Sequence, residues 1–389
     1  MNDRARPSRR RVCGRRLALT MLLLAAGAVA AAGTPISLQF LHPIATTPDP
    51  ETDAGVRLSL LWGRSGSVRA LDLGLVAGAT SGDVRGLQWQ TFYAGVGGEL
   101  RGLGLSAGVH LVQQDVSGLQ LGGLAAWSGG RVGGVQAAGA VAYADGGFGG
   151  VQLSGLMNAS DGPGGFLQLA SVANVNVGDF RGVQIAGFVN HANAELSGLQ
   201  LGGFNNAESA MGVQVGLVNL GGEMNGFQIG AINRARQLDG VPVGLINTTP
   251  GSPRGWIFYG STLSLGNLSY HTEVNRWTSQ LSLGYGDNHG SQDEALTLAW
   301  HYGYRVLGDA RWWLGIDLGF VHIMPKASDD PEVNDRLHWA LQPRLNGELA
   351  LGRHVGIWAA AGASFIQSSY DSGAESETEL LLAGGVVLR

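Results

Sequence analysis

The sequence predicts an all-β protein in which a glycine-rich tandem-repeat β-solenoid is followed by an antiparallel β-barrel-like region. Three observations lead to this prediction: a Gln motif that recurs every 16 residues, a C-terminal third of long alternating strands, and 64 Gly among 389 residues of which only 14% are charged. Such a chain is too apolar to be disordered and too rich in glycine for an ordinary globular domain. The alternative is one large outer-membrane β-barrel that includes the repeats.

Residues 1–32 have the pattern of a cleaved signal peptide. Seven Arg precede an apolar run that starts at Leu17, and the small residues from Ala28 to Gly33 suit a signal peptidase. The apolar run is short for a membrane anchor. The single cysteine, Cys13, lies in this segment, so the mature chain is predicted to hold no disulfide and no Cys-based metal site. We expect an exported protein, in the outer membrane or at the cell surface of a double-membraned bacterium.

The charge balance argues against nucleic acid as a partner. Removal of residues 1–32 takes away seven Arg and one Asp, which leaves 25 − 7 = 18 basic and 30 − 1 = 29 acidic residues, a net charge of −11. Nucleic-acid-binding domains are usually basic. No later stretch is long and apolar enough for a transmembrane helix, which leaves soluble, peripheral and β-barrel states open.

A tandem repeat occupies residues 65–250, after an N-terminal β segment at 33–64. Gln recurs every 16 residues and, in the last units, every 14, which gives twelve units in register. The Gln residues are Gln88, Gln120, Gln136, Gln152, Gln168, Gln184, Gln200, Gln214 and Gln228, with Asp72, Gly104 and Pro242 at equivalent positions. Apolar residues flank each of these positions, and Gly stands two places before it in almost every unit. This alternation is a strand pattern.

A second column of amides favours parallel stacking. Asn follows the Gln by six residues in many 16-residue units and by five in the 14-residue units, as at Asn190 and Asn219. Stacked coils would let each amide bond to the coils above and below. In an up-and-down barrel alternate units should differ, and they do not, so we favour a solenoid of about twelve coils. We expect the residues beside each Gln, such as Ile185, to face its core, and Gln184 to lie on the opposite, partly solvated face.

Residues 255–389 predict an antiparallel, barrel-like region of about eight strands. In "ALTLAWHYGYRVL" the apolar residues Leu296 to Val306 alternate with Thr297, His301 and Arg305, and Trp and Tyr lie near strand ends. The acidic segments "GDNHGSQDEA", "PKASDDPEVNDR" and "DSGAESETE" are predicted as loops that alternate with tight turns at Gly308-Asp309 and Gly352-Arg353. Long loops on one side and short turns on the other are typical of outer-membrane barrels. A soluble β-sandwich is the alternative.

The repeats "GVQVGLVN", "GFQIGAIN" and "GVPVGLIN" resemble those of the leptospiral-type surface-repeat family. The resemblance covers about residues 36–270 and includes the opening strand "ISLQFLHP", the segment "LSLLWG" and Pro242 in the last unit. It implies a surface or outer-membrane location and supplies no catalytic residue.

Motifs that could carry chemistry have structural interpretations. "GLSAG" around Ser106 matches a nucleophile elbow, and residues 102–107 match a dinucleotide fingerprint, but both lie in repeat register without a strand–turn–helix context. The nine His show no zinc spacing. We therefore predict no catalytic, cofactor-binding or metal-binding residues and no cofactor.

Two groups of charged residues in the C-terminal region remain. The group of His301, Arg305, Asp317, Arg344 and Glu348 is interpreted as ion pairing inside a small barrel. A second group could bind Ca²⁺ but lacks EF-hand spacing, and a solvated loop is preferred; its members are Asp329, Asp330, Glu332 and Asp335.

The predicted function is that of a non-enzymatic outer-membrane or cell-surface repeat protein with a structural or surface-interaction role, and the alternative is an outer-membrane pore. The expected partner is outer-membrane lipid, contacted through the C-terminal region. The sequence does not identify a surface ligand.

Overall fold

The computed structural model describes residues 36–287, 294–325, 337–370 and 373–389. The predicted signal peptide at 1–32 and the carboxylates Asp329, Asp330, Glu332 and Asp335 lie outside these residues. The described residues form a parallel β-solenoid of about 13 turns, followed by a closed antiparallel barrel of eight strands. The predicted fold class is therefore confirmed, and the alternative of one large barrel is wrong. No helix in the described ranges is long and apolar enough to cross a membrane.

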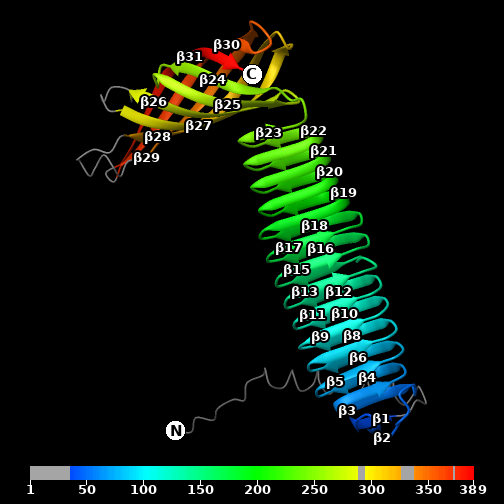
Figure 1. Cartoon of the computed structure of the whole chain (residues 1–389). Coiled ribbons are helices and arrows are strands. Elements are labelled where there is room, and N and C mark those ends of the chain that lie inside the picture. The colour runs from blue at the N-terminus through cyan, green and yellow to red at the C-terminus, as the bar shows by residue number, and fades with distance from the viewer. Residues whose placement is uncertain (1–35, 288–293, 326–336, 371–372) are drawn as a thin grey trace, which may run out of the picture. The chain divides into compact units, whose positions relative to one another are not determined.

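The chain divides into two compact units, with the boundary after Ala194. The first unit holds the 16-residue coils, whose stacking is visible in Figure 1. Most of these coils contribute one strand of seven residues and one of four residues, and each pairs in parallel with the same strand of the next coil. The longer strands are β4 (Val68–Gly74), β6 (Val84–Gln90), β8 (Leu100–Ser106), β10 (Val116–Gly122), β12 (Val132–Ala138), β16 (Gly164–Ala170) and β18 (Phe180–Ala186), with β14 (Val151–Ser154) shortened. The shorter ones are β5 (Ala77–Thr80), β7 (Tyr93–Val96), β9 (Val109–Val112), β11 (Ala125–Ser128), β13 (Val141–Ala144), β15 (Met157–Ser160) and β17 (Ala173–Asn176).

The N-terminal segment belongs to the solenoid, although its spacing is irregular. It contains β1 (Ile36–Leu41), β2 (Ile44–Ala45) and β3 (Ala54–Ser65). Leu38 of β1 pairs in parallel with Leu58, and Leu58 pairs with Leu73 of the first regular coil. The short strand β2 pairs with β1 in the antiparallel direction. This hairpin covers the edge of the first coil, where unpaired backbone groups would otherwise invite further strands.

The 14-residue coils of the last repeats are built from longer strands. They are β20 (Phe204–Val215), β21 (Val218–Ile229), β22 (Ile232–Val243) and the final short β23 (Ile246–Thr248), preceded by β19 (Val189–Leu201). Strands β20, β21 and β22 pair in parallel and in register; Asn lies opposite Asn throughout, and Gln214 lies opposite Gln228, whereas Gln228 lies opposite Pro242. The shorter repeat therefore keeps both amide columns.

The Gln residues point into the solenoid, and this reverses the predicted facing. Gln184 is 0% exposed, whereas Ile185 is half-buried on the outer surface. Successive Gln side chains bond to each other: Gln152 Nε2 donates to Gln136 Oε1 at 2.9 Å, and Gln168 Nε2 donates to Gln152 Oε1 at 2.7 Å. The same amide of Gln152 also donates to the carbonyl of Ala159. The ladder satisfies the buried amides from coil to coil, so the core position that we assigned to Ile185 is wrong.

The Asn residues form a second buried ladder. Asn158 Nδ2 donates to Asn174 Oδ1 at 2.9 Å, and Asn219 Nδ2 donates to Asn233 Oδ1 at 2.8 Å. Here each amide donates to the following coil, whereas each Gln donates to the preceding one. Another interior column is apolar and fully buried; it includes Val84, Leu100, Val116, Val132, Phe148, Phe180 and Leu196.

The Gly two places before each Gln is required by the close stacking of coils. Gly118 has φ +131°, and a Cβ on it would lie 2.1 Å from the carbonyl oxygen of Gly102 in the preceding coil. An L side chain would therefore be strained in its backbone and would clash with the neighbouring coil.

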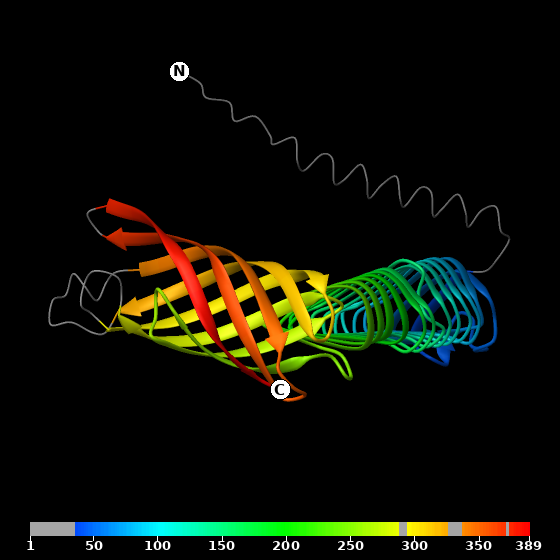
Figure 2. The ribbon, with the colours of Figure 1, turned by 90° about the horizontal axis from the view of Figure 1, so that it is seen from above.

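The second unit ends in the barrel, whose tilted strands are seen in Figure 2. Its strands are β24 (Arg254–Ser261), β25 (Gly266–Val274), β26 (Trp277–Asp287), β27 (Glu294–Gly308), β28 (Trp312–Pro325), β29 (Leu337–Ala350), β30 (Val355–Tyr370) and β31 (Gly373–Leu388). Closure comes from antiparallel pairing of β24 with β31. Short turns at 275–276, 309–311 and 351–354 lie at one end. The acidic stretch "DSGAESETE", predicted as a loop, lies mostly within β31, so that loop assignment is wrong.

Candidate functional site

The outer wall of the barrel is apolar. Side chains of β28 alternate along the strand, so that Leu314, Ile316 and Leu318 are 53%, 52% and 56% exposed while their neighbours point inward. Leu298 and Leu345 on other strands face outward in the same way. Exposed aliphatic side chains around a closed barrel form the kind of surface that membrane β-barrels present to lipid.

Aromatic side chains gather toward the short-turn end of this wall. Trp277 stacks on Tyr302 with ring centroids 5.5 Å apart, and Tyr304 meets the same indole edge-on at 4.9 Å. Trp256 packs against Tyr270 at 5.1 Å. Amphipathic rings near one end of an apolar wall match the aromatic girdles of outer-membrane barrels.

The centre of the lumen holds a buried ion pair. Arg344 Nε and Nη2 donate to Asp317 at 2.8 and 2.9 Å. Asn346 also donates to this carboxylate, and Arg344 Nη2 reaches Gln280 Oε1 at 3.2 Å. The guanidinium lies 5.3 Å from the ring centroid of Trp358. The pair is therefore bidentate and fixed by polar and aromatic neighbours, which offset the cost of its burial.

Two further ion pairs line the lumen. Arg389 reaches Glu348 at 2.5 Å, and Arg305 reaches Glu273 at 3.1 Å. Trp313 Nε1 also donates to Glu348, at 3.4 Å. With the central pair, three ion pairs therefore line the described part of the lumen.

Apolar side chains occupy much of the rest of the described lumen. One apolar cluster is formed by Ile257, Tyr259, Trp313, Trp358, Ala360 and Val387, and another by Ala295, Ala299, Val321, Ile323 and Ala340. Between them, the cavity beside His301, Gln342 and Arg344 measures about 30 Å³. A space of this size holds on the order of one or two water molecules.

The predicted charged group is partly confirmed. Asp317 and Arg344 form an ion pair, but Arg305 and Glu348 have other partners, Glu273 and Arg389. The ring of His301 bonds to Gln342 at 3.0 Å instead of joining an ion pair. Sequence reasoning missed Glu273 and Arg389 because their partners come from strands distant in sequence. The alternation of apolar and polar residues predicts which side chains point inward, but it does not predict which of them lie next to each other.

Ser106 has no catalytic surroundings among the described residues. Its side chain is 1% exposed inside the solenoid, and its oxygen accepts a hydrogen bond from the backbone N–H of Gly108. The nearby His110 bonds to Gln120, and burial lowers the pKa of His110 to about 3. Residues 102–107 lie within and just after β8, and no helix follows them. Neither motif has the geometry that its chemistry requires.

The outer surface of the solenoid has two contrasting sides. From Gly86 to Asn247, eleven segments that run from two places before each Gln position to the Asn position contain no Asp, Glu, Lys or Arg. We call their outward surface the charge-free side. All nine acidic and five basic residues between 86 and 247 lie in the intervening segments, which we call the acidic side.

The acidic side stabilises the turns between coils. Asp83, one repeat before Glu99 and just outside the defined range, accepts a hydrogen bond from the backbone N–H of Glu99 at 3.0 Å, and this bond holds the pKa of Asp83 below its usual value. Asp115 accepts from the backbone N–H of Arg131 in the same way, at 2.7 Å. These carboxylates therefore have structural partners in the next coil. Within the described ranges, no three His, Cys, Asp or Glu side chains are grouped to hold a metal ion.

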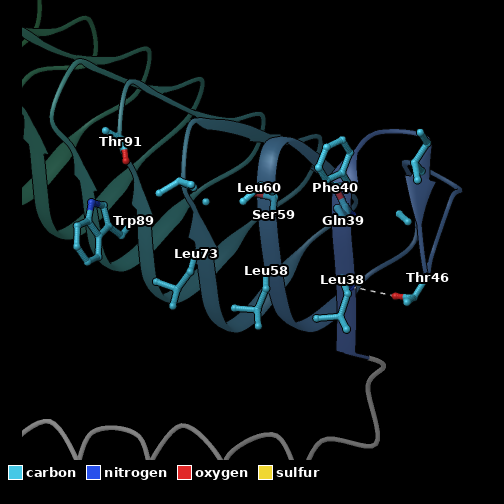
Figure 3. Close-up of a pocket in the computed structure, with 14 residues that line it drawn as sticks. Leu38, Gln39, Phe40, Thr46, Leu58, Ser59, Leu60, Leu73, Trp89 and Thr91 are labelled. Carbon is cyan, nitrogen blue, oxygen red and sulfur yellow. Dashed lines mark hydrogen bonds between the residues drawn. The ribbon is translucent and has the colours of Figure 1, made fainter.

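Two apolar pockets hollow the outer surface of the coils, and together we call them the groove. The first has a volume of about 800 Å³ and is lined mostly by the coils before Gly86, together with Trp89 and Thr91 of the charge-free side. Figure 3 shows Leu38, Leu58 and Leu73 pointing to the same side from successive coils, with Trp89 next in line. Phe40 and other apolar residues line it further. Farther along the coils, a second hollow of about 500 Å³ has Leu121, Leu153 and Leu169 on its wall, with a floor of Gly122, Gly123, Ala138, Gly139, Ser154, Ala170 and Ser171. Sequence reasoning missed this groove because it assigned these leucines to the core.

Comparison with known protein families, with curated proteins and with solved structures finds no match. The resemblance to the leptospiral-type surface-repeat family stays a prediction.

Proposed function

We propose that this chain is a non-enzymatic, exported outer-membrane protein whose barrel is a closed anchor and whose solenoid has a structural role at the membrane. The observation that carries the proposal is the combination of an apolar outer wall with a lumen occupied by ion pairs and apolar clusters. Lipid would satisfy the wall around Leu314, Ile316 and Leu318. An aqueous environment would leave these side chains in a large exposed apolar surface, which soluble monomers rarely have.

The filled lumen favours an anchor over a pore. Eight-stranded barrels have interiors just wide enough for side chains, and here the Arg344–Asp317 pair and two apolar clusters occupy that space. The pore predicted as the alternative would need these groups to move together. No observation of the described lumen favours such a movement.

Chain topology supports a periplasmic solenoid. Strand β24 starts at the same end of the barrel as the short turns, so the last coils enter the barrel from the short-turn side. In outer-membrane barrels the short turns face the periplasm and the longer loops face outward. The proposed location therefore narrows from "outer membrane or cell surface" to an outer-membrane barrel with its repeats on the periplasmic side.

Conductance tests the anchor. The full-length protein in planar lipid bilayers is expected to insert without steady channel openings, and unboiled protein is expected to show the altered electrophoretic mobility of a folded barrel. A double variant, Arg344→Ser with Asp317→Ser, removes the central pair and is expected to leak small ions. Steady openings of the wild type would support the pore, and failure of the wild type to enter vesicles would contradict the membrane barrel.

Cysteine labelling tests the orientation. In a Cys13→Ser background, Leu265→Cys lies in the loop 262–265 at the end opposite the short turns, where the side chain is 82% exposed. Val177→Cys lies on the acidic side of the solenoid. A membrane-impermeant maleimide should label the first in intact cells and the second only after the outer membrane is permeabilised. The reverse result would restore the cell-surface solenoid.

A further inference from the structure

We propose that the charge-free side of the solenoid is a lipid-binding surface whose groove takes the acyl chains of membrane lipid. The inference rests on the proposed function in one respect, which is that the barrel lies in a lipid bilayer. It assigns lipid contact to the repeats themselves, whereas the sequence suggested such contact only for the C-terminal region.

The first argument is the contact between the last coil and the barrel wall within the second unit. Ser279 Oγ donates to the carbonyls of Gly244 and Leu245 at 2.7 and 2.9 Å, and Trp300 Nε1 donates to Gly244 at 3.2 Å. Ser279 has the same facing on β26 as the outward Leu283, yet it is only 1% exposed. The last coil therefore covers outer wall that lipid would otherwise contact.

Through this contact, the last segment of the charge-free side lies against the barrel wall that we propose faces lipid. Gly244 and Leu245 belong to the last charge-free segment, at the positions that form the groove floor and corner in earlier coils. Trp300 belongs to the aromatic group near the short-turn end, where it packs 6.0 Å from Tyr302. Such aromatic side chains lie at the membrane interface in outer-membrane barrels. The apolar surface of the last coil is thus continuous with the lipid-facing wall.

The second argument is the distribution of charge around each coil. An element that lies in a membrane interface presents one apolar side to the acyl chains and one charged side to water. Here the exposed Phe92, Leu124 and Phe188, at 64%, 58% and 67%, stand at one corner of their coils, and every ionisable Asp, Glu and Arg from 86 to 247 stands elsewhere. The excess of acidic residues on the other side is repelled by anionic lipid head groups, so only the charge-free side suits lipid contact.

The third argument is the chemistry of the groove itself. Its backbone N–H and C=O groups are paired between parallel coils, as in the full register of β10 with β12, so lipid contact would leave few of them unsatisfied. The walls carry leucines without hydrogen-bonding groups, and the floor is small. A protein partner needs polar contacts to fix its register, whereas acyl chains need only a smooth apolar channel. These features favour lipid over a second copy of the chain.

Spin labels on the full-length protein test the proposal. Single cysteines in a Cys13→Ser background replace Leu73 and Leu153 in the groove, Val177 on the acidic side and Leu318 on the barrel wall. The labelled proteins are reconstituted into vesicles of phosphatidylethanolamine and phosphatidylglycerol, and collisions of each label with oxygen and with a water-soluble nickel chelate are measured. Oxygen concentrates in acyl chains, and the chelate stays in water. Labels at 73 and 153 should give an oxygen-to-nickel ratio close to that at 318 and severalfold above that at 177.

The label at Leu318 separates the two proposals. A lipid-like ratio at 318 with a water-like ratio at 73 and 153 would overturn the lipid-binding groove while keeping the membrane barrel. A water-like ratio at 318 would overturn the membrane barrel, and the groove proposal with it. Low collision with both reagents at 73 and 153, with short distances between equivalent labels, would show a second copy on this side and would also overturn the lipid assignment.

Discussion

The solenoid and the barrel both turn polar side chains inward, but they satisfy them in different ways. In the solenoid, Gln136, Gln152 and Gln168 bond to copies of themselves in adjacent coils. In the barrel, Arg344 bonds to a different side chain, Asp317, that a separate strand supplies. Parallel in-register stacking brings like residues together, and like residues can bond only if each is both donor and acceptor, as an amide is. Antiparallel strands bring unlike residues together and so permit ion pairs.

The difference predicts how each region responds to loss of an element. A repeat coil contributes one more copy of the same contacts, and its neighbours can restack without it. A barrel strand contributes contacts that occur once, and closure depends on the number of strands. The following variants test this contrast, beginning with the largest expected effect.

Deletion of one element should separate the regions most clearly. Removal of Ala137–Gln152, a single 16-residue coil, leaves Gln136 and Gln168 able to bond directly, and folding is expected to survive. Removal of Asp309–Pro325, which contains β28, should abolish closure of the barrel. Circular dichroism and heat-dependent electrophoretic mobility would measure both. A coil deletion that aggregates, while a two-coil deletion folds, would contradict the parallel solenoid.

Loss of the one buried ion pair among the described solenoid residues should be the most costly single substitution. Arg57 bonds to both oxygens of Asp72 at 2.7 and 2.6 Å, and both side chains are 0% exposed. Arg57→Met leaves the carboxylate buried without its cation, at a cost of about 3–5 kcal/mol in the free energy of unfolding. The matched control is Arg69→Met, which removes an exposed pair with Asp53 and should cost below about 1 kcal/mol. Urea unfolding of the two variants in detergent would compare them, and equal costs would contradict the burial of the first pair.

Neighbouring residues of one strand should respond in opposite ways. Gln152→Leu removes the amide that donates to Gln136 and the oxygen that accepts from Gln168. Because these buried groups lose their partners, the expected cost in the free energy of unfolding is on the order of 3 kcal/mol. Leu153→Gln changes an outward side chain and should cost below about 1 kcal/mol. The same unfolding measurement applies. A larger cost for the Leu153 variant would restore the apolar core that the sequence suggested.

The Gln ladder has a gap at Gly104, which stands at a Gln position. A substitution that fills this gap should stabilise the solenoid. A Cβ on Gly104 would lie 2.4 Å from His110 Nε2, so the imidazole occupies the place of the missing Gln. Gly104→Gln alone should destabilise, whereas Gly104→Gln with His110→Ala removes the imidazole, and the Cδ2 methyl of Leu100, 2.6 Å from the new Cβ, then has to shift. The double variant supplies a partner to the unpaired Gln88 Oε1 and removes the unpaired His110 Nε2, with a gain of about 1–2 kcal/mol.

The gain should grow in acid. Burial lowers the pKa of His110 from its usual 6.5 to about 3, so the folded state resists protonation. Above pH 6.5 the imidazole is neutral in both states; as the pH falls toward 3, only the unfolded state takes up the proton and stability is lost. Urea midpoints between pH 7 and 4 should therefore fall less for the double variant than for the wild type. Parallel curves would contradict a buried, neutral His110.

The sequence predicted the repeat, the strands and the amide ladders because the spacing of Gln and Asn fixes which residues stack. It did not predict their facing, because alternation shows only that Gln184 and Ile185 lie on opposite sides. The assumption that aliphatic residues are buried then placed Ile185 inside. That assumption fails here because the ladder satisfies the hydrogen bonds of the buried amides, and because lipid is the proposed neighbour of the aliphatic side chains on the charge-free side.

Long-range pairing accounts for the other missed features. The first coils lack the 16-residue spacing of the later repeats, so the parallel pairing of Leu38 with Leu58 could not be predicted from a sequence period. In the barrel, alternation predicted that Arg305 and Glu348 face inward, but not that Glu273 and Arg389 are their partners. Such choices depend on strand register and closure, which local patterns do not determine.

The two ends of the Gln ladder determine whether a second molecule could extend the stack of coils. Gln88 donates to Asp72, a carboxylate that has no proton to pass on, and Pro242 stands opposite Gln228 without any amide. Stacked amide columns resemble the spine of an amyloid fibril, in which each layer is a template for the next. Here the column closes chemically at both ends, so a second molecule finds no amide on which to continue it. A geometry suited to endless polymerisation is thereby limited to a fixed number of coils.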